Sequence, residues 1–236
     1  MLICGIDFET TGLDSKLDRI TEVGAVLMDW ESGVPFRMLS RLVHPGRPIP
    51  LEVEKLTGIS DGLVSLYGFS ESEVMGELCL MIEEADYAMA HNGTAFDSLF
   101  FQESLKRIGL RPPQRLWLDT KTDIRYPETI TTRNLRHLAS EHEFLNPFAH
   151  RAVFDVLTML KVASRYNLDE IIARAKEPTI YVQAVVSFDD KDKAKARGYY
   201  WHSPRKIWWR TFKESDYVVE KEACGFRTAI LLGAPE

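Results

Sequence analysis

Cysteine is scarce in this chain. Its 236 residues include three, Cys4, Cys79 and Cys224, which are far apart in the sequence and odd in number. This spacing excludes a disulfide framework and a C-x-x-C metal site. The expectation that remains is a set of reduced thiols in the core of a cytosolic protein.

Long apolar segments are also missing. No hydrophobic run approaches the roughly 18 residues that a membrane-spanning helix needs. The first residues, MLICGIDF, lack the basic region and the long apolar stretch of a signal peptide. With 45% hydrophobic and 27% charged residues, the composition is that of an ordinary soluble globular protein. We therefore expect a cytoplasmic protein without a membrane partner, long enough for one main domain and a smaller one.

Positive charge is in short supply and unevenly placed. The formal net charge is −6, which at first disfavours a nucleic-acid partner. Residues 176–236 hold 11 Lys and Arg against 9 Asp and Glu, a net +2, which leaves −8 for residues 1–175. This asymmetry fits an enzyme whose site stays acidic until metal fills it and whose separate basic module meets phosphates.

Apolar periodicity divides the chain into regular elements. Three strands are expected first, at 2–7, 21–30 and 35–43. Helices and strands then alternate, with helices at 71–85, 96–108, 134–142 and 151–166 and strands at 87–91 and 116–118. This order predicts an α/β fold in which helices cover a mixed sheet on both sides.

The periodicity lapses near residues 168–178, where Pro178 intervenes. We place a domain boundary there, with residues 1–174 in the main domain and residues 175–236 in a small α+β domain. In the small domain we expect a strand at 180–188 and a short helix at 189–197 that ends at Gly198. A hairpin of 199–202 with 206–212 would follow.

Two acidic residues close the first predicted strand. Asp7 and Glu9 are two positions apart, so their side chains point to the same face. Adjacent carboxylates at the mouth of a core are costly unless a cation lies between them. The alternative is a strand-end turn with solvated acids. The tight polar turn that follows, Thr10–Leu13, weakens this alternative because its backbone amides could bind a ligand.

A third acidic residue, Asp97, lies in the first turn of the helix expected at 96–108. The segment before it, Ala90-His91-Asn92-Gly93, ends the preceding strand. The helix dipole alone can stabilise an acid at this position, which is the alternative interpretation. The sheet order nevertheless brings this turn to the edge that carries Asp7 and Glu9.

His150 and Asp155 are five residues apart, about 140° beyond one helical turn, so they cannot share a helical face. A histidine in the loop before the helix could still lie over a site that Asp155 faces. A capping or core histidine is the alternative for His150. Asp155 falls within the apolar run Val153–Leu157, where a carboxylate without a partner is unfavourable.

In combination, the order D-x-E, H-N-x-x-x-F-D and H-x-x-x-x-D resembles the histidine-bearing branch of the DEDD family of 3′–5′ exonucleases. This branch includes the proofreading subunit of the bacterial replicative polymerase. The resemblance covers roughly residues 1–166 and includes Ile20-x-Glu22-x-Gly24 and Leu56-Thr57-Gly58-Ile59. It implies the ribonuclease H-like fold, and every metal and base position of the family is matched.

The resemblance also implies roles for single residues. Asp7 would bridge two metal ions that Glu9, Asp97 and Asp155 help to hold, and His150 would activate the attacking water. Oxygen ligands suit Mg²⁺, two per site, and Mn²⁺ could substitute. Contacts to the substrate are implied for Thr10, Leu13 and Leu56, with Asn92 supporting the site.

Aromatic and basic residues interleave in residues 188–212, where three of the five tryptophans lie. Aromatic rings stack on bases and cations pair with phosphates, so the segment predicts a surface for single-stranded nucleic acid. The candidate contacts are Trp201, Lys206, Trp208, Trp209 and Arg210. The alternative is that the aromatic residues serve the small domain's own core. Strand alternation is expected to bury one of Trp208 and Trp209 and to expose the other.

The same segment is similar to a small module of unassigned function found beside plasmid- and phage-type primases and nucleases. Residues 183–188 also resemble a sliding-clamp peptide, although the first strand of the small domain explains them better.

Three functional hypotheses follow. The first is a 3′–5′ exonuclease that releases nucleoside 5′-monophosphates from single-stranded DNA, alone or as a proofreader beside a polymerase or sliding clamp. The second is an exoribonuclease, because no residue clearly reads the 2′-hydroxyl. The third is a non-catalytic nucleic-acid-binding or polymerase-associated module, which the presence of all five chemical positions disfavours.

Overall fold

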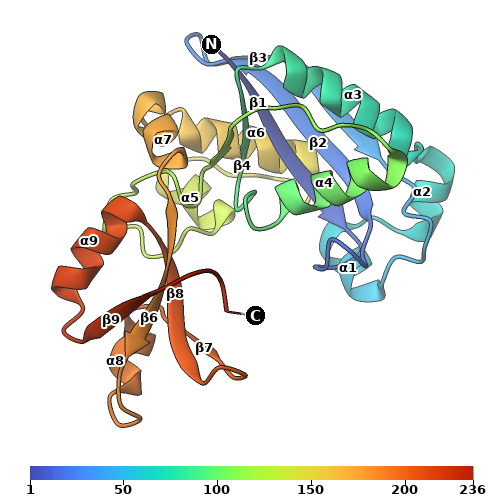
Figure 1. Cartoon of the computed structure of the whole chain (residues 1–236). Helices are drawn as coiled ribbons and strands as arrows, with labels where there is room; N and C mark the ends of the chain where they lie inside the picture. Colours follow the sequence, from blue (N-terminus) through green and yellow to red (C-terminus); the bar gives the residue numbers. More distant parts are fainter. Residues whose placement is uncertain (236) are drawn as a thin grey trace. The chain divides into compact units, whose positions relative to one another are not determined.

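The computed structural model describes residues 1–235, which divide into two compact units (Figure 1). The main unit comprises Met1–Ala175, and the C-terminal unit begins at Lys176. Across the described residues, no helix combines the length and the apolar character that crossing a bilayer requires.

The main unit is built on a five-stranded mixed sheet with the strand order β3-β2-β1-β4-β5. Its strands are β1 (Leu2–Thr10), β2 (Ile20–Asp29), β3 (Val34–Leu42), β4 (Tyr87–Ala90) and β5 (Trp117–Asp119). The first three pair antiparallel, whereas β4 is parallel to β1 and β5 is parallel to β4. The carboxyl ends of β1, β4 and β5 therefore meet at one edge, as the sequence predicts for the acidic segments.

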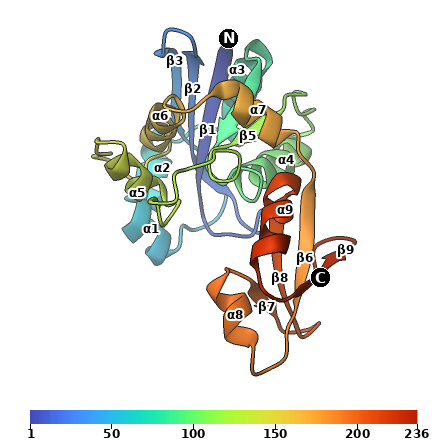
Figure 2. The ribbon, with the colours of Figure 1, turned by 90° about the vertical axis from the view of Figure 1, so that its left-hand side faces the viewer.

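Helices cover both faces of this sheet (Figure 2). On one face, α3 (Glu71–Glu84) and α4 (Asp97–Ile108) pack with Cys4, Ile6 and Phe8 of β1 in one hydrophobic cluster. On the other, α6 (Ala152–Ala163) and α7 (Leu168–Ala175) pack with Ile3, Val26 and Met89. The prediction of a ribonuclease H-like mixed sheet covered on both sides is thus confirmed.

Alternation along β1 decides where its acidic residues point. Because Cys4, Ile6 and Phe8 face α3 and α4, the intervening residues face α6. A Cβ added to Gly5 would lie 2.7 Å from Cγ1 of Val156 in α6, which shows how closely the helix approaches this face. Asp7 and Glu9 follow Gly5 at steps of two and therefore point to the α6 side.

The N-terminus of α6 is fixed to β2 by two residues. Glu22 accepts hydrogen bonds from the backbone amide of Ala152 (3.0 Å) and from the Arg151 guanidinium (2.8 Å). Its carboxylate thereby satisfies a free amide of the first helical turn, where a negative charge is also favoured. Two residues further along β2, a Cβ on Gly24 would lie 2.3 Å from the backbone of both Ala152 and Val153.

Several elements differ from the sequence-based expectation. Periodicity missed two seven-residue helices, α1 (Leu51–Thr57) and α2 (Asp61–Tyr67), because each is too short to repeat an apolar stripe. The lapse expected at 168–178 was wrong in its first part, since α7 continues the fold there. In the C-terminal unit, α9 (Glu214–Ala223) and β9 (Arg227–Leu231) were also missed. The helix predicted at 134–142 is α5 (Leu135–Glu141).

The C-terminal unit has its own four-stranded antiparallel sheet, in the order β7-β8-β6-β9. Its strands before β9 are β6 (Thr179–Val185), β7 (Tyr200–His202) and β8 (Ile207–Lys213). Two helices, α8 (Lys191–Ala196) and α9, lie on the same side of this sheet (Figure 2). The hydrophobic cluster between them and the sheet contains Val182, Ala184, Ala194, Tyr199, Phe212 and Tyr217. The predicted strand, helix and hairpin of this unit are all present.

The close approach of α6 to β2 yields a first prediction. Gly24→Ala places a methyl group against helix backbone that cannot rotate away, and such overpacking costs about 1–3 kcal/mol. We expect the melting temperature to fall by about 2–4 °C for each kcal/mol. The matched control is Gly76→Ala within α3, where an added Cβ meets nothing within 4 Å. That variant should gain about 0.5–1 kcal/mol from helix propensity. Equal melting temperatures for the two variants would contradict the proposed contact.

Candidate active site

One cavity of the main unit gathers the predicted acidic residues and the histidine. It has a volume of about 590 Å³ and lies where β1 ends and where α4 and α6 begin. Its lining includes Asp7, Glu9, Asn92, Asp97, His150 and Asp155.

A hydrogen bond from β1 fixes the side chain of Asp97 in this cavity. It is the first residue of α4 and only 2% exposed, and its Oδ1 accepts a hydrogen bond from the backbone amide of Phe8 (3.1 Å). Burial raises the pKa of Asp97 to about 7, although the bond from Phe8 acts in the opposite direction. The contact ties the acid that follows β4 to the strand that carries Asp7 and Glu9.

Asp155 organises the loop that presents His150. Its Oδ2 accepts a hydrogen bond from the backbone amide of His150 (2.8 Å), and its Oδ1 accepts one from Nδ2 of Asn146 (2.7 Å). His150 has a left-handed backbone conformation, with φ of 64°, and an exposed side chain. As expected from the sequence, it lies in the loop just before α6.

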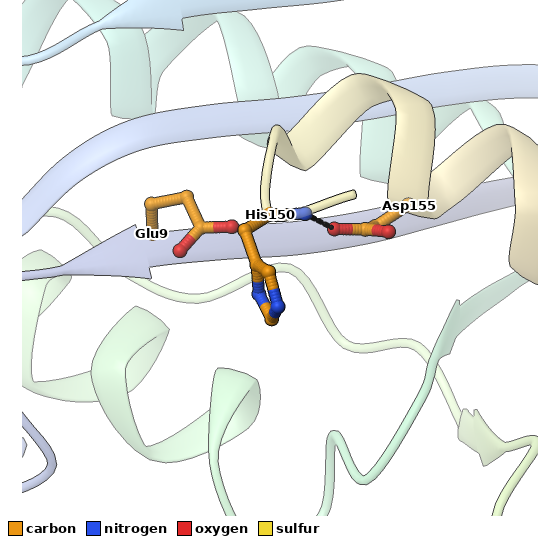
Figure 3. A group of neighbouring side chains, drawn as sticks. All are labelled: Glu9, His150 and Asp155. Carbon is orange, nitrogen blue, oxygen red and sulfur yellow. Dashed lines mark hydrogen bonds between the residues drawn. The ribbon is translucent and has the colours of Figure 1, made fainter. Parts of the chain in front are cut away.

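Glu9, His150 and Asp155 form a tight group of potential metal ligands (Figure 3). One ligand atom from each lies within 4.8 Å of the others. Figure 3 shows the histidine between the two carboxylates, with Glu9 reaching in from β1 and Asp155 from α6. Two segments that are distant in sequence, the end of β1 and the start of α6 with its preceding loop, therefore converge on one point.

The crowding of carboxylates is electrostatically unfavourable. Burial, followed by the negative charges of Asp97 and Glu9, raises the pKa of Asp7 well above its ordinary value. Burial, followed by the charges of Asp155 and Glu22, raises the pKa of Glu9 to about 8. Burial also raises the pKa of Asp155. Each carboxylate would regain its charged form if cations bound among them.

The donor set fits hard divalent cations. The cavity lining supplies four carboxylates and the imidazoles of His91 and His150, and no cysteine is among the residues that line it. Mg²⁺ and Mn²⁺ prefer carboxylate oxygen, whereas structural zinc sites commonly use thiolates. The raised pKa values and the donor chemistry therefore agree.

The buried acid Asp119, which the sequence did not indicate, stabilises the turn after β4 that lines the cavity. Asp119, at the end of β5, accepts hydrogen bonds from the backbone amide of Asn92 (2.9 Å) and from the amide and hydroxyl of Thr94. These bonds hold the turn between β4 and α4, in which Asn92 has a φ of 67°. The side-chain oxygen of Asn92 in turn accepts a hydrogen bond from Nζ of Lys121 (3.0 Å). The only feature of the sequence that could have indicated this role is the position of Asp119 at the end of a strand.

The cavity also has basic residues in its lining, which the sequence analysis missed. These are Lys121, Arg133 and Arg136. Both arginines are exposed, and Arg133 donates to the carbonyl of Lys121 (2.8 Å). Lys121 and Arg133 come from the segment between β5 and α5, whose irregular sequence gives no periodic pattern, whereas Arg136 lies in the first turn of α5. The cavity thus combines a cluster of acids with cations that suit phosphate groups.

The predicted substrate contacts lie in different surroundings. Asn92 lines the cavity, whereas Thr10, Leu13 and Leu56 are absent from its lining. The Thr10 hydroxyl donates to the carbonyl of Gly12 (2.5 Å). Leu13 is 87% exposed and Leu56 is 58% exposed, which is unusual for leucine side chains. Contacts of these three residues with a substrate stay predictions.

Comparison with known proteins places the chain in a family. A profile of the RNase T family, described as an exonuclease, matches residues 4–163. The chain belongs to this family. The sequence-based predictions of a DEDDh-type fold and of a 3′–5′ exonuclease are therefore confirmed. Exonucleases of this family typically use divalent metals.

Two bacterial relatives show where such domains occur. The exonuclease is 30% identical over 176 residues to the PolC-type DNA polymerase III of Listeria monocytogenes. The aligned residues make up 74% of this chain and 11% of the polymerase. It is 34% identical over 116 residues to the 3′–5′ exonuclease DinG of Bacillus subtilis, which covers 49% and 12% of the two chains. The chain spans about a tenth of the length of these relatives.

Solved structures share the fold at low sequence identity. One is Exonuclease I of E. coli in complex with a dT13 oligonucleotide, with a TM-score of 0.60 and 15% identity over 78% of this chain and 48% of that one. Another is the nuclease domain of 3′hExo, a DEDDh family member bound to rAMP. Its TM-score is 0.59 with 18% identity, over 71% of this chain and 92% of that one.

The raised pKa values predict how stability depends on pH. A raised pKa means that the folded state holds its proton more tightly than the unfolded state, so stability is lost as the pH rises through that pKa. For Glu9 and Asp97 this window extends from their ordinary values to about 8 and about 7. With a chelator present, we expect the melting temperature to fall by several degrees between about pH 5 and about pH 8. Differential scanning calorimetry at a series of pH values measures this change in melting temperature.

The control is the double variant Glu9→Gln, Asp97→Asn, whose profile should be flatter over this range. Added Mg²⁺ should also flatten the profile of the unaltered protein. A melting temperature that rises with pH in the chelated protein would contradict the assignment of these two acids.

Proposed function

We propose that this exonuclease removes nucleotides from the 3′ ends of single-stranded DNA and releases nucleoside 5′-monophosphates, with two Mg²⁺ ions per site. The observation that carries the proposal is the convergence of four carboxylates and His150 in one cavity. Neither a binding module nor a structural protein needs to keep so many acids together at such electrostatic cost.

The residues that would hold the metal ions are Asp7, Glu9, Asp97 and Asp155. When bound there, two ions would supply neutralisation of charge on the scissile phosphate, ionisation of the attacking water and stabilisation of the 3′-oxygen that leaves. The amide of Phe8 fixes Asp97, and the amide of His150 fixes Asp155. The protein therefore orients two of its four carboxylates through its own backbone.

His150 is suited to act as the general base. Its side chain is exposed to the cavity and lies within ligand distance of Glu9 and Asp155. A neutral imidazole is the commonest general base in enzymes, so a ring nitrogen of His150 can accept the proton of water as the water attacks phosphorus.

Basic residues would position the substrate. We assign Lys121, Arg133 and Arg136 to the phosphates next to the one that is cut, because they line the same cavity and arginine pairs well with phosphate oxygens. Leu13 and Leu56 offer exposed apolar surface for contact with the terminal bases. Asn92 completes the wall of the cavity.

DNA is favoured over RNA by the relatives. The PolC-type enzyme is a DNA polymerase, and the structure of Exonuclease I contains an oligothymidine. The 3′hExo structure, which contains rAMP, keeps exoribonuclease activity as the second candidate. A cytoplasmic location, a polymerase or clamp partner, and a role in proofreading or DNA repair stay predictions.

Substrate and direction can be tested together. The protein is incubated with DNA and RNA oligonucleotides labelled at the 3′ or the 5′ end, with Mg²⁺ or with chelator. We expect immediate release of a labelled mononucleotide from 3′-labelled single-stranded DNA, slower loss from RNA, and no reaction in chelator. Release of the label first from the 5′ end, or full activity in chelator, would refute the proposal.

The assigned roles predict different losses for two variants. Asp7→Asn removes a ligand and should reduce turnover to background. It should also raise the melting temperature in chelator, because it removes a buried charge from the acidic cluster. His150→Ala should reduce turnover by roughly 10²–10⁴-fold and leave measurable activity.

The control for the histidine is His137→Ala. His137 is in α5, where it pairs with Glu141 (3.6 Å), and it does not line the cavity. Its loss should leave turnover unchanged. Full activity of Asp7→Asn in Mg²⁺ would exclude the two-metal site proposed here.

A further inference from the structure

The sheet of the C-terminal unit has two unlike faces. Even-numbered residues of β6 and β8, such as Val182 and Phe212, point into the hydrophobic cluster beneath α8 and α9. Directly paired residues of antiparallel strands share a face. The odd-numbered residues of β6 and β8 therefore point to the other side, which no helix of residues 176–235 covers. We call this side the open face.

Three aromatic residues lie next to one another on the open face. Tyr200 of β7 is paired directly with Trp209 of β8, and Trp209 is paired with Gln183 of β6. The rings of Tyr181 and Trp209 stack, with centroids 6.4 Å apart and an angle of 30° between their planes. Tyr200 is 68% exposed. An aromatic row therefore crosses three strands, with Tyr200 exposed and Tyr181 and Trp209 partly exposed.

The charge of this sheet is of one sign. None of its four strands contains an aspartate or a glutamate, although acids outnumber basic residues in the chain as a whole. Lys213 and Arg227 lie in register positions of the open face. The acidic residues of the unit lie elsewhere, at Glu177, in segment 189–192 and in α9. The helical side thus carries acids together with the lysines of α8 and α9, whereas the strands of the sheet carry basic residues without acids.

This combination narrows the class of ligand. Aromatic rings exposed side by side on a sheet can stack on successive bases, which is favourable for every base type. Cations without neighbouring acids on the same strands suit a polyanion. A protein partner would instead favour a contiguous apolar patch, whereas the open face interleaves its aromatic residues with Gln183, Thr211 and Arg227.

We propose that the open face of the C-terminal unit binds single-stranded nucleic acid, with Tyr181, Trp209 and Tyr200 stacking on bases and Lys213 and Arg227 contacting phosphates. This second site is separate from the active-site cavity in sequence and in chemistry. It binds without hydrolysis and needs no metal. Its sequence tolerance follows from stacking rather than from hydrogen bonds to base edges.

The contact residues that the sequence suggests lie on different faces of the sheet. Trp209 belongs to the open face. Trp201 and Trp208 are paired on the other face, with ring centroids 5.5 Å apart, and Trp208 packs against the hydrophobic cluster. The Arg210 guanidinium donates to the carbonyl of Arg197 (2.5 Å). These interactions within the unit favour structural roles for Trp208 and Arg210.

Lys206 lies in the turn between β7 and β8, with a φ of 51°, and belongs to neither face. Contact of nucleic acid with Lys206 stays a prediction.

The test compares neighbouring aromatic residues on opposite faces. Binding of a labelled oligothymidine to the full chain is measured by fluorescence anisotropy in chelator, so that nothing is cut. Loss of one stacking contact in Tyr200→Ala should weaken binding about five- to hundredfold. Tyr200→Phe should restore affinity, because the ring is retained. Trp201→Ala, in the next position of the same strand, is the control and should bind as tightly as the unaltered protein.

A charge pair completes the design. Arg227→Gln should lower the slope of log affinity against log salt by about one. Lys221→Gln, an exposed cation in α9 on the helical side, should leave the slope unchanged. Hydrolysis of a small chromogenic phosphodiester, which can reach only the active site, should be unaltered in all these variants.

The outcomes separate this site from the proposed catalytic activity. Unchanged oligothymidine affinity in Tyr200→Ala, or equal weakening in Trp201→Ala, overturns the proposal. A change of oligomeric state in Tyr200→Ala with unchanged affinity also overturns it, because the face would then join copies of the chain. If the chain hydrolyses no phosphodiester yet Tyr200→Ala binds more weakly, the open face stands and the proposed exonuclease activity fails.

Discussion

The attachment of α6 to β2 is the constraint on which the rest of the site depends. Glu22 accepts hydrogen bonds from Ala152 and Arg151 at the start of the helix, and Gly24 allows the helix backbone to lie against the strand. The helix then carries Asp155 to the edge of the sheet, and the carboxylate of Asp155 holds the loop of His150. Without this attachment, Asp7 and Glu9 of β1 would not face Asp155 and His150.

The same attachment adds to the electrostatic cost of the site. Glu22 is itself buried, and its negative charge raises the pKa of both Asp7 and Glu9. Its pairing with Arg151 and with the amide of Ala152 offsets part of that cost locally. Under the proposed function, bound cations would offset the remainder. Stability in the absence of metal would then be lower in exchange for affinity toward metal, as is common where function requires like charges in contact.

The sequence predicted those parts of the site that follow from local geometry. Alternation along one strand was enough to place Asp7 and Glu9 together, and an apolar run was enough to mark Asp155 as unusual. Asp119 and Glu22 could not be assigned in this way, because their roles depend on hydrogen bonds to segments 25 or more residues away. Arg133 lies in an irregular segment, where no periodicity shows which way a side chain points.

The fold was predicted to a similar depth. Long amphipathic elements such as α3 and α6 were found, whereas α1, α2 and α9 depend on tertiary packing. Alternation was expected to bury one of Trp208 and Trp209 and to expose the other. Both are instead partly exposed, because Trp208 packs only partly against the hydrophobic cluster and Trp209 is partly covered by the ring of Tyr181. The two residues do point to opposite faces, as strand geometry requires.

The left-handed backbone at residue 150 limits what evolution can place there. β-Branched and bulky side chains are disfavoured in that conformation, while glycine, asparagine, aspartate and histidine enter it more readily. Of these four, histidine alone combines a neutral resting form with a basic nitrogen at physiological pH. The backbone conformation at residue 150 thus restricts the side chain to a few residue types, independently of the requirements of catalysis.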